Sequence, residues 1–247
     1  MSIRRDDNKG SCGGVGYAGI VMIIGALLAF EARDAFASEE SVDQLTHTAL
    51  ALDADGGRGA LQFTQYCVRC HGSKGYGDSN HEIPALAGQR FAYLVRQLAN
   101  LSEGQRESDT AHRVLSTEAL RDPQSWADIA AYLHDAPARY HAKTGDGTKL
   151  ALGEGIFHLQ CASCHHDDAG GDDDGFVPSL RNQHYSYLVK QLGRLSEYDR
   201  HNVPENLVRF LRSFDSDEVS AVADYLSRLR GPGRERRTNS NSGAVIE

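Results

Sequence analysis

The sequence predicts an all-α protein in which two homologous domains follow one another along the chain. The pentapeptide Cys-x-x-Cys-His occurs at residues 67–71 and again at 161–165, 94 positions later. Many residues after the first copy recur after the second at the same spacing, as expected for an internal repeat. Apolar residues return at helical intervals in both halves, and no strand pattern stands out.

The N-terminus has the pattern of a secretory signal peptide. Two arginines precede an apolar run over residues 15–30, and an Ala-Phe-Ala tripeptide ending at Ala37 forms the cleavage site. We expect residues 1–37 to be removed and the mature protein to lie in a bacterial periplasm. The alternative is a retained anchor, which would be the protein's contact with a membrane, although the apolar run is shorter than the roughly 20 residues of a full span.

Without this segment the chain would be acidic and would have no methionine. Residues 1–37 contain four basic and four acidic side chains, so the net charge stays at −8 after cleavage. Cleavage also removes Cys12 and Met22, which leaves four cysteines, all of them in the two pentapeptides. The acidity argues against nucleic-acid binding and favours protein partners with a basic docking face.

The mature length suits two small domains better than one. The expected segments are a polar leader at 38–58, a first domain at 59–135, a linker at 136–152, a second domain at 153–230 and a disordered tail at 231–247. The leader has a pattern for one short helix from Val42 to Leu52. The tail is rich in Arg, Asn and Ser and has few apolar side chains to bury.

Each domain is expected to contain three to four helices. The first leads into the pentapeptide, with Phe63 or Phe157 four residues before the first cysteine. The third begins in the first domain at Asp122, a capping residue followed by Pro123, and in the second near Ser216. The second helix has apolar residues at helical period, namely Tyr93, Leu94, Leu98 and Leu101, matched by Tyr187, Leu188, Leu192 and Leu195.

The pentapeptides predict two covalently bound haem c groups. Cysteines at i and i+3 project from one helical turn, so both thiols can add to the vinyl groups of a haem while the next histidine lies under the iron. The expected residues are Cys67, Cys70 and His71, and Cys161, Cys164 and His165. A redox dithiol and a four-cysteine zinc site are the alternatives. Zinc pairs lie about 15 to 20 residues apart, and neither alternative explains the histidines.

These features resemble class I cytochromes c, and the tandem arrangement resembles the dihaem cytochrome c4 type. The resemblance is specific at Leu-Ala-Gly-Gln (86–89) and Tyr-Leu-x-x-Gln-Leu (93–98), and it covers both domains. It implies two domains related by a pseudo-twofold axis, haems close enough to exchange electrons, and periplasmic electron transfer. It also implies that the carbonyls of Pro84 and Pro178 accept hydrogen bonds from the histidines that bind iron.

The sequence departs from this family at the axial methionine. The corresponding positions hold Arg113 and Leu207, and neither can serve as that ligand. The second domain also departs after its pentapeptide, where His166 replaces the glycine of the family's Cys-His-Gly. A further difference is Arg-Asn at 181–182, where the first domain has Ala-Gly at 87–88.

Histidine is the expected replacement for methionine. His112 lies one residue from the methionine position, and we expect it to bind iron in the first domain; the alternative is a solvent-facing loop histidine. Its repeat partner is Asn206, a poor iron ligand, while His201 lies in the equivalent loop and is equally compatible with ligation and with a surface role. Further candidates, each more typical of a surface or haem-edge residue, are His81, His134, His141, His158, His166 and His184.

The predicted function is transfer of single electrons between redox protein partners by a periplasmic dihaem c-type cytochrome that is not an enzyme. A second imidazole favours ferric iron, so we expect lower potentials than in a methionine-ligated relative. The alternative is a haem enzyme, such as a peroxidase or sulfur-compound dehydrogenase, or a gas-binding protein. Either would use an open coordination position in the second domain.

Overall fold

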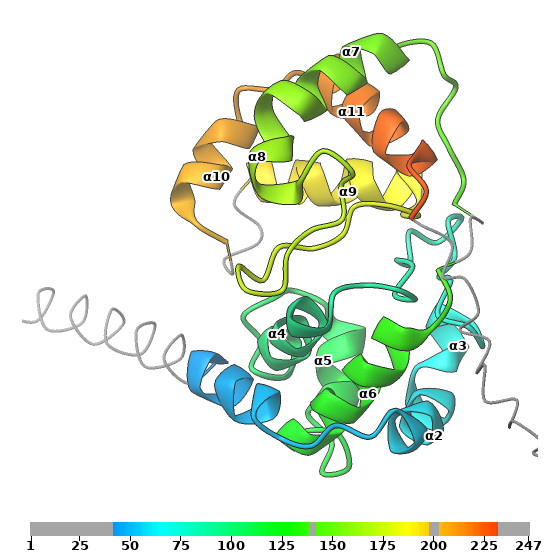
Figure 1. The fold of residues 1–247 in the computed structure, drawn as a ribbon, viewed down its shortest axis with the longest axis vertical. Coiled ribbons are helices and arrows are strands. Elements are labelled where there is room, and N and C mark those ends of the chain that lie inside the picture. Colours follow the sequence, from blue (N-terminus) through cyan, green and yellow to red (C-terminus); the bar gives the residue numbers. More distant parts are fainter. Residues whose placement is uncertain (1–41, 139–141, 198–202, 232–247) are drawn as a thin grey trace, which may run out of the picture. The chain divides into compact units, whose positions relative to one another are not determined.

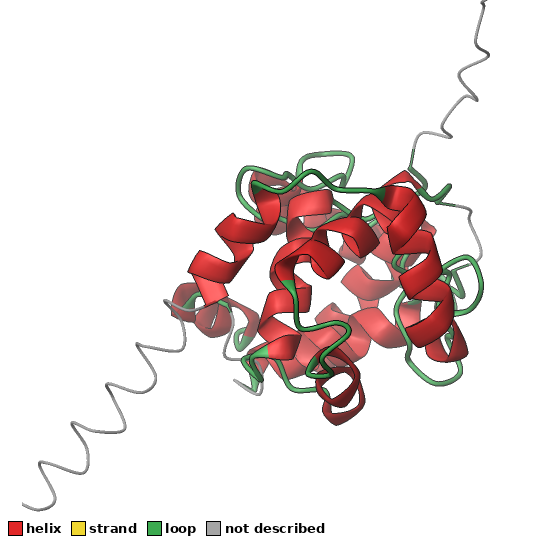
Figure 2. Ribbon diagram, turned by 90° about the horizontal axis from the view of Figure 1, so that it is seen from below, coloured by secondary structure: helices red, strands yellow, loops and turns green. Residues whose placement is uncertain are grey.

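The computed structural model describes residues 42–138, 142–197 and 203–231, which belong to one compact unit, Ser41–Glu247. The described residues form helices and loops without strands, as Figure 2 shows, so the all-α prediction is confirmed. The predicted signal peptide and nearly all of the predicted tail lie outside the described residues, as do His141 and His201. No helix in the described part of the chain is long and apolar enough to cross a membrane.

The helices fall into two sets of matching order (Figure 1). The first set is α2 (Gly56–Tyr66), α3 (Val68–His71), α4 (Phe91–Ser102), α5 (Asp109–Leu115) and α6 (Pro123–Asp135). The second set is α7 (Leu150–Ile156), the π-helical turn η1 (Phe157–Cys161), α8 (Ala162–His165), α9 (Tyr185–Ser196), α10 (Glu205–Leu211) and α11 (Ser216–Arg228). In the first set α6 packs on α2 and α4, and in the second α11 packs on α7 and α9.

Local capping chemistry determines where the last helix of each set begins. The Asp122 carboxylate accepts a hydrogen bond from the Gln124 amide, and Pro123 stands at the first helical position of α6. Asp215 caps α11 in a capping box with Glu218. The starts predicted at Asp122–Pro123 and near Ser216 are therefore confirmed.

Each set of helices has its own apolar core. Phe63 and Trp126 are fully buried in the first, and Phe157 and Val222 in the second. A helix over residues 42–50 also contributes buried side chains to the first core. Those residues were predicted to lie in a polar leader outside the first domain. The apolar face of their helix instead packs against the core of the first domain.

Glycines allow the first and last helices of each set to cross closely. A Cβ atom on Gly59 would lie 1.9 Å from the carbonyl oxygen of Asp128 on α6. The repeat-equivalent Gly153 has the same relation to α11, with 2.0 Å to the carbonyl oxygen of Ala221. Any larger residue would have to separate these helices.

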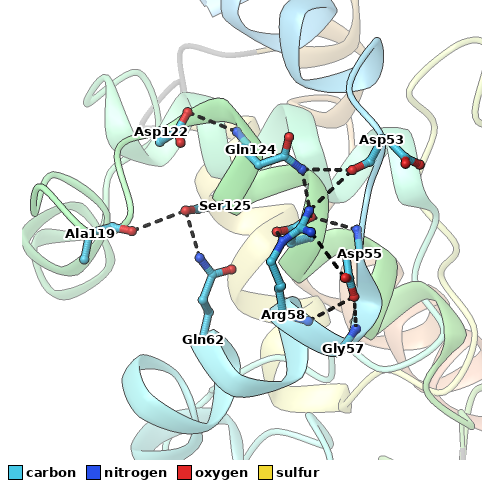
Figure 3. Close-up of polar contacts among 10 residues, drawn as sticks. Asp53, Asp55, Gly57, Arg58, Gln62, Ala119, Asp122, Gln124 and Ser125 are labelled. Carbon is cyan, nitrogen blue, oxygen red and sulfur yellow. Dashed lines mark hydrogen bonds and ion pairs between the residues drawn. The ribbon is translucent and has the colours of Figure 1, made fainter.

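A polar cluster closes the α2–α6 crossing (Figure 3). The buried Asp128 carboxylate accepts from Arg58 Nε at 2.7 Å and Nη2 at 2.9 Å. It also accepts from the Asp55 amide at 2.7 Å and from Gln124 Nε2 at 2.9 Å. The charge is thus both paired and hydrogen-bonded, the condition under which burying a carboxylate is tolerated.

Candidate functional site

Both pentapeptides occupy a short helical turn after a break in a longer helix. α2 ends at Tyr66, and the amide of Cys67 donates to the Phe63 carbonyl at 2.9 Å before α3 begins. In the second half the π-helical turn ends at Cys161 and α8 follows directly. The cysteines and the histidine of each motif therefore belong to one turn, as covalent haem attachment requires.

The four described cysteines form no disulfide. Cys67 and Cys161 are half-buried, whereas Cys70 and Cys164 are exposed. Burial, assisted by the neighbouring cysteine of each pair, raises the pKa of Cys67 and of Cys161 to about 11. A nucleophilic redox dithiol needs a lowered thiol pKa, so the environment does not favour that alternative.

The four-cysteine zinc alternative also lacks support. Within the described ranges no group of three or more histidine, cysteine or acidic side chains is arranged to hold a metal ion. Each cysteine pair instead lies on the same short helical turn as the histidine of its own pentapeptide.

Each pentapeptide histidine faces the carbonyl of a proline. His71 Nδ1 lies 3.2 Å from the oxygen of Pro84, and His165 Nδ1 lies 3.0 Å from that of Pro178. Both hydrogen bonds that the family resemblance implies are thus present. The tautomer that donates through Nδ1 leaves the Nε2 lone pair available to a metal.

The surroundings favour the neutral form of these two histidines. Burial lowers the pKa of His71 and of His165, and the hydrogen bonds to the proline carbonyls only partly oppose this. The positive charge of Arg106 lowers the pKa of His71 further, while His166 does the same for His165. A neutral imidazole is the form that binds iron.

The loop between each histidine and its proline turns back through a glycine that the sequence reasoning did not single out. Gly77 has φ 72° and its amide donates to the His71 carbonyl at 3.0 Å. A Cβ there would lie 2.5 Å from the Pro84 carbonyl oxygen. Gly171 repeats this conformation beside Pro178. The matching spacing of the two glycines, 94 residues, was the signal that could have revealed them.

Arg106 places a positive charge near His71. Its half-buried guanidinium donates to Gln97 Oε1 at 2.9 Å and to the hydroxyl of Tyr187 in the other half at 2.8 Å. These partners are neutral, so they do not compensate the charge. A haem carries two propionates, and a half-buried cation with neutral partners is suited to them.

The predicted distal ligand His112 lies on α5. It is half-buried, and its Nδ1 is 2.9 Å from the carbonyl oxygen of Leu101 at the end of α4. This is the same kind of contact that the pentapeptide histidines make, and it also leaves Nε2 available. Asn206, its partner in the sequence repeat, is the second residue of α10, whereas His112 is the fourth residue of α5. Arg113 and Leu207, at the methionine positions, are exposed.

The structure argues against ligation by His184. This residue is 4% exposed, its Nδ1 accepts from the Lys143 amide at 3.3 Å, and its Nε2 is 2.8 Å from the Tyr76 carbonyl oxygen. Both ring nitrogens are therefore in use. The other described candidates are His81, His134 and His158, which have hydrogen-bond partners, and His166, which is exposed.

Two helical units, each with a Cys-x-x-Cys-His turn and a proline carbonyl behind its histidine, define a class I c-type cytochrome. The cytochrome c family profile matches residues 150–230. The thiosulfate dehydrogenase electron acceptor of Stutzerimonas stutzeri is 31% identical over 182 residues, covering 69% of this chain and 82% of the relative. Cytochrome c4 of Pseudomonas aeruginosa is 27% identical over 192 residues, covering 74% and 92%.

Solved structures agree with these relatives. Reduced recombinant cytochrome c4 from Pseudomonas stutzeri superposes with a TM-score of 0.62 at 25% identity, covering 72% of this chain and all of that one (100%). A thiosulfate dehydrogenase from Marichromatium purpuratum gives 0.61 at 26% identity, covering 70% of this chain and 40% of the other. The chain therefore belongs to the cytochrome c family as a dihaem member of the cytochrome c4 type, an electron carrier with covalently bound haem c.

Proposed function

We propose that this protein is a periplasmic carrier that passes single electrons between redox protein partners through one haem c in each half. The observation that carries the proposal is the duplicated arrangement of two cysteines on one helical turn and a histidine whose Nδ1 is hydrogen-bonded to a proline carbonyl. Haem c supplies reversible one-electron chemistry when bound at such a site. The signal-peptide pattern of residues 1–37 supports the periplasmic location.

The chain's own residues hold and orient the cofactor. Cys67, Cys70, Cys161 and Cys164 would form the thioether bonds, and His71 and His165 would bind the iron from the proximal side. Pro84 and Pro178 fix the tautomer and the ring orientation of those histidines. Arg106 would neutralise propionate charge between the halves.

In the first half His112 would be the distal ligand. Its hydrogen bond to the Leu101 carbonyl supports this role, because histidines that bind metals usually donate their other ring N–H to an oxygen. Two imidazoles on one iron favour the ferric state, so this haem would have a lower potential than with methionine.

The partners would be redox proteins that present a basic face to this acidic chain, whose net charge is −8. The Stutzerimonas stutzeri relative is named for accepting electrons from thiosulfate dehydrogenase. That name supports an oxidoreductase of this class as the first donor to test.

A haem enzyme or a gas-binding protein is the second candidate, and one observation favours it. The partner of His112 in the sequence repeat is Asn206 on α10, which is a poor ligand for iron. His201, which lies outside the described residues, is then the remaining histidine of that loop. If it does not bind, one axial side of the second haem is open to peroxide or carbon monoxide.

Electron paramagnetic resonance of the oxidised mature protein, with both haems quantified, tests these proposals. A carrier with two histidine-ligated irons gives two low-spin signals, and its reduced form does not bind carbon monoxide. His112→Ala should turn one haem high-spin, whereas His81→Ala, which removes an exposed histidine, should change neither signal. A stoichiometric high-spin haem in the unsubstituted protein would contradict a pure carrier and support an open site in the second half.

A further inference from the structure

Two glutamines exchange matching hydrogen bonds between the halves. Gln183 Oε1 accepts from the Ala85 amide at 2.9 Å, and its Nε2 donates to the Ala85 carbonyl at 3.0 Å. Gln89 makes the reciprocal pair with Ser179, at 2.7 Å and 2.9 Å. Because Ala85 and Ser179 are repeat partners, each side-chain amide pairs with the same backbone position of the opposite half.

The peptide group held by each glutamine is the one that orients the histidine of the opposite half. The Ala85 N–H belongs to the peptide bond whose carbonyl is that of Pro84. That carbonyl oxygen lies 3.2 Å from His71 Nδ1. A continuous path of two hydrogen bonds and one peptide group therefore joins His71 to Gln183.

The second half contains the mirror arrangement. The Ser179 N–H and the Pro178 carbonyl belong to one peptide group, with Gln89 on one side and His165 Nδ1 on the other at 3.0 Å. Each path therefore runs from a histidine in one half to a glutamine in the other half. Neither relation follows from the sequence motif alone, since Gln183 is 112 residues from His71 and Gln89 is 76 residues from His165.

Such a path has an electronic consequence. A hydrogen bond accepted from the N–H of a peptide group polarises its carbonyl, which then accepts more strongly from the next donor. A stronger acceptor at Nδ1 makes an imidazole a better electron donor to a metal on Nε2. Better donation stabilises ferric iron and lowers the reduction potential. Gln183 is only 7% exposed, so water competes little for its bond to Ala85.

We propose that Gln183 and Gln89 are crossed positioning residues, each of which lowers the reduction potential of the haem in the opposite half through a proline peptide group. The inference rests on the proposed function, because it takes His71 and His165 as iron ligands. Docking of the two halves then sets both potentials as well as the distance between the haems.

The test is a spectroelectrochemical titration of the holoprotein and of Gln183→Leu. Each midpoint is assigned by following the NMR signals of residues 67–71 and 161–165 through the titration. Gln183→Leu should raise the midpoint of the first haem, changing its ferric-to-ferrous ratio at fixed potential by about tenfold, or about 59 mV. The second midpoint should stay where it was, and the His71 Nδ1 proton should move upfield as its hydrogen bond weakens.

The direction of the shift separates this effect from simple loosening of the interface. Admitting water to a haem stabilises the more highly charged ferric state, and therefore lowers the potential instead of raising it. Ser186→Ala is a matched control, because Ser186 also bonds a backbone carbonyl of the other half, Ser79 at 2.8 Å, but lies outside the path. Gln183→Glu keeps the acceptor for the Ala85 amide and should not raise the first midpoint.

Gln89→Leu is the reciprocal variant, and it should raise the second midpoint alone. It also keeps the proposal testable if Gln183→Leu does not fold. Unchanged midpoints, a shift in the haem of the glutamine's own half, or a lowered potential would overturn the crossed path while leaving the carrier proposal intact. Failure of the unsubstituted protein to attach haem at both pentapeptides would overturn both.

Discussion

Gly72 and His166 occupy the same place after their pentapeptides and share one backbone conformation. Gly72 has φ 71° and ψ 161°, and His166 has φ 61° and ψ 159°. This region of backbone space is open to glycine and strained for every residue with a Cβ. The second half therefore keeps the loop geometry of the first while bearing a backbone cost that the first avoids.

Relief of this strain predicts that His166→Gly stabilises the protein. The free energy of unfolding should rise by about 1 to 2 kcal/mol, since the exposed histidine side chain contributes little packing. Gly72→Ala is the matched reverse change. A Cβ at this position meets no atom within 4 Å. A decrease of about the same size in the free energy of unfolding would therefore be a backbone effect alone. Guanidinium unfolding followed by circular dichroism measures both changes, and a His166→Gly variant that is no more stable than the unsubstituted protein would argue against strain.

The buried Asp128 predicts a loss of stability in acid. Burial raises its pKa, but the hydrogen bonds from Arg58, the Asp55 amide and Gln124 lower it more, so the folded-state pKa lies below the usual value. A depressed carboxyl pKa contributes stability above the unfolded-state value of about 3.9, and this contribution disappears as pH falls through the folded pKa.

Asp128→Asn removes this charge with little change of shape. At pH 7 it should lower the free energy of unfolding by about 2 kcal/mol, the scale of hydrogen bonds to a charged group. The difference from the unsubstituted protein should shrink below pH 4. Asp122→Asn is the control, because asparagine also caps helices well. A difference that stayed constant from pH 7 to pH 3 would contradict the assigned ionisation.

Local signals made part of this structure predictable. Asp122 and Pro123 start α6 because capping and proline geometry act within one turn. The pentapeptides predicted their own helical turns for the same reason. The seven-residue helices α5 and α10 were not assigned individually, because so few residues give little periodicity to detect.

Relations between distant residues could not be read from the chain. The match of Gln89 with Gln183 was visible as part of the repeat, but their crossed pairing depends on how the two halves dock. His184 was one of several candidate ligands, and only its burial and its two hydrogen bonds show that its ring nitrogens are occupied. Sequence gives residue chemistry, whereas tertiary packing decides which nitrogen remains available.

Two glycines on α7 give opposite predictions. Gly153→Ala should destabilise the protein by about 3 kcal/mol, because the new methyl group would overlap the Ala221 carbonyl of α11. Gly155→Ala meets no atom within 4 Å and should stabilise by about 0.8 kcal/mol through helix propensity. Thermal unfolding of both variants checks the helix crossing, and equal effects would mean that α7 and α11 do not approach as closely as described.

Substitution of His112 by methionine tests the distal ligand in a way that deletion does not. If His112 binds iron, His112→Met offers a softer ligand that favours ferrous iron. The midpoint potential of one haem should then rise by on the order of 100 mV. This shift is well within the span of about 0.8 V that axial ligands can set. The other midpoint should hold within a few millivolts. The near-infrared charge-transfer band of methionine–ferric haem coordination should appear for one haem.

Arg113→Met, at the neighbouring exposed position, is the control and should leave both midpoints unchanged while His112 is present. A rise in Arg113→Met but not in His112→Met would place the ligand position at residue 113 and remove His112 from the coordination of iron.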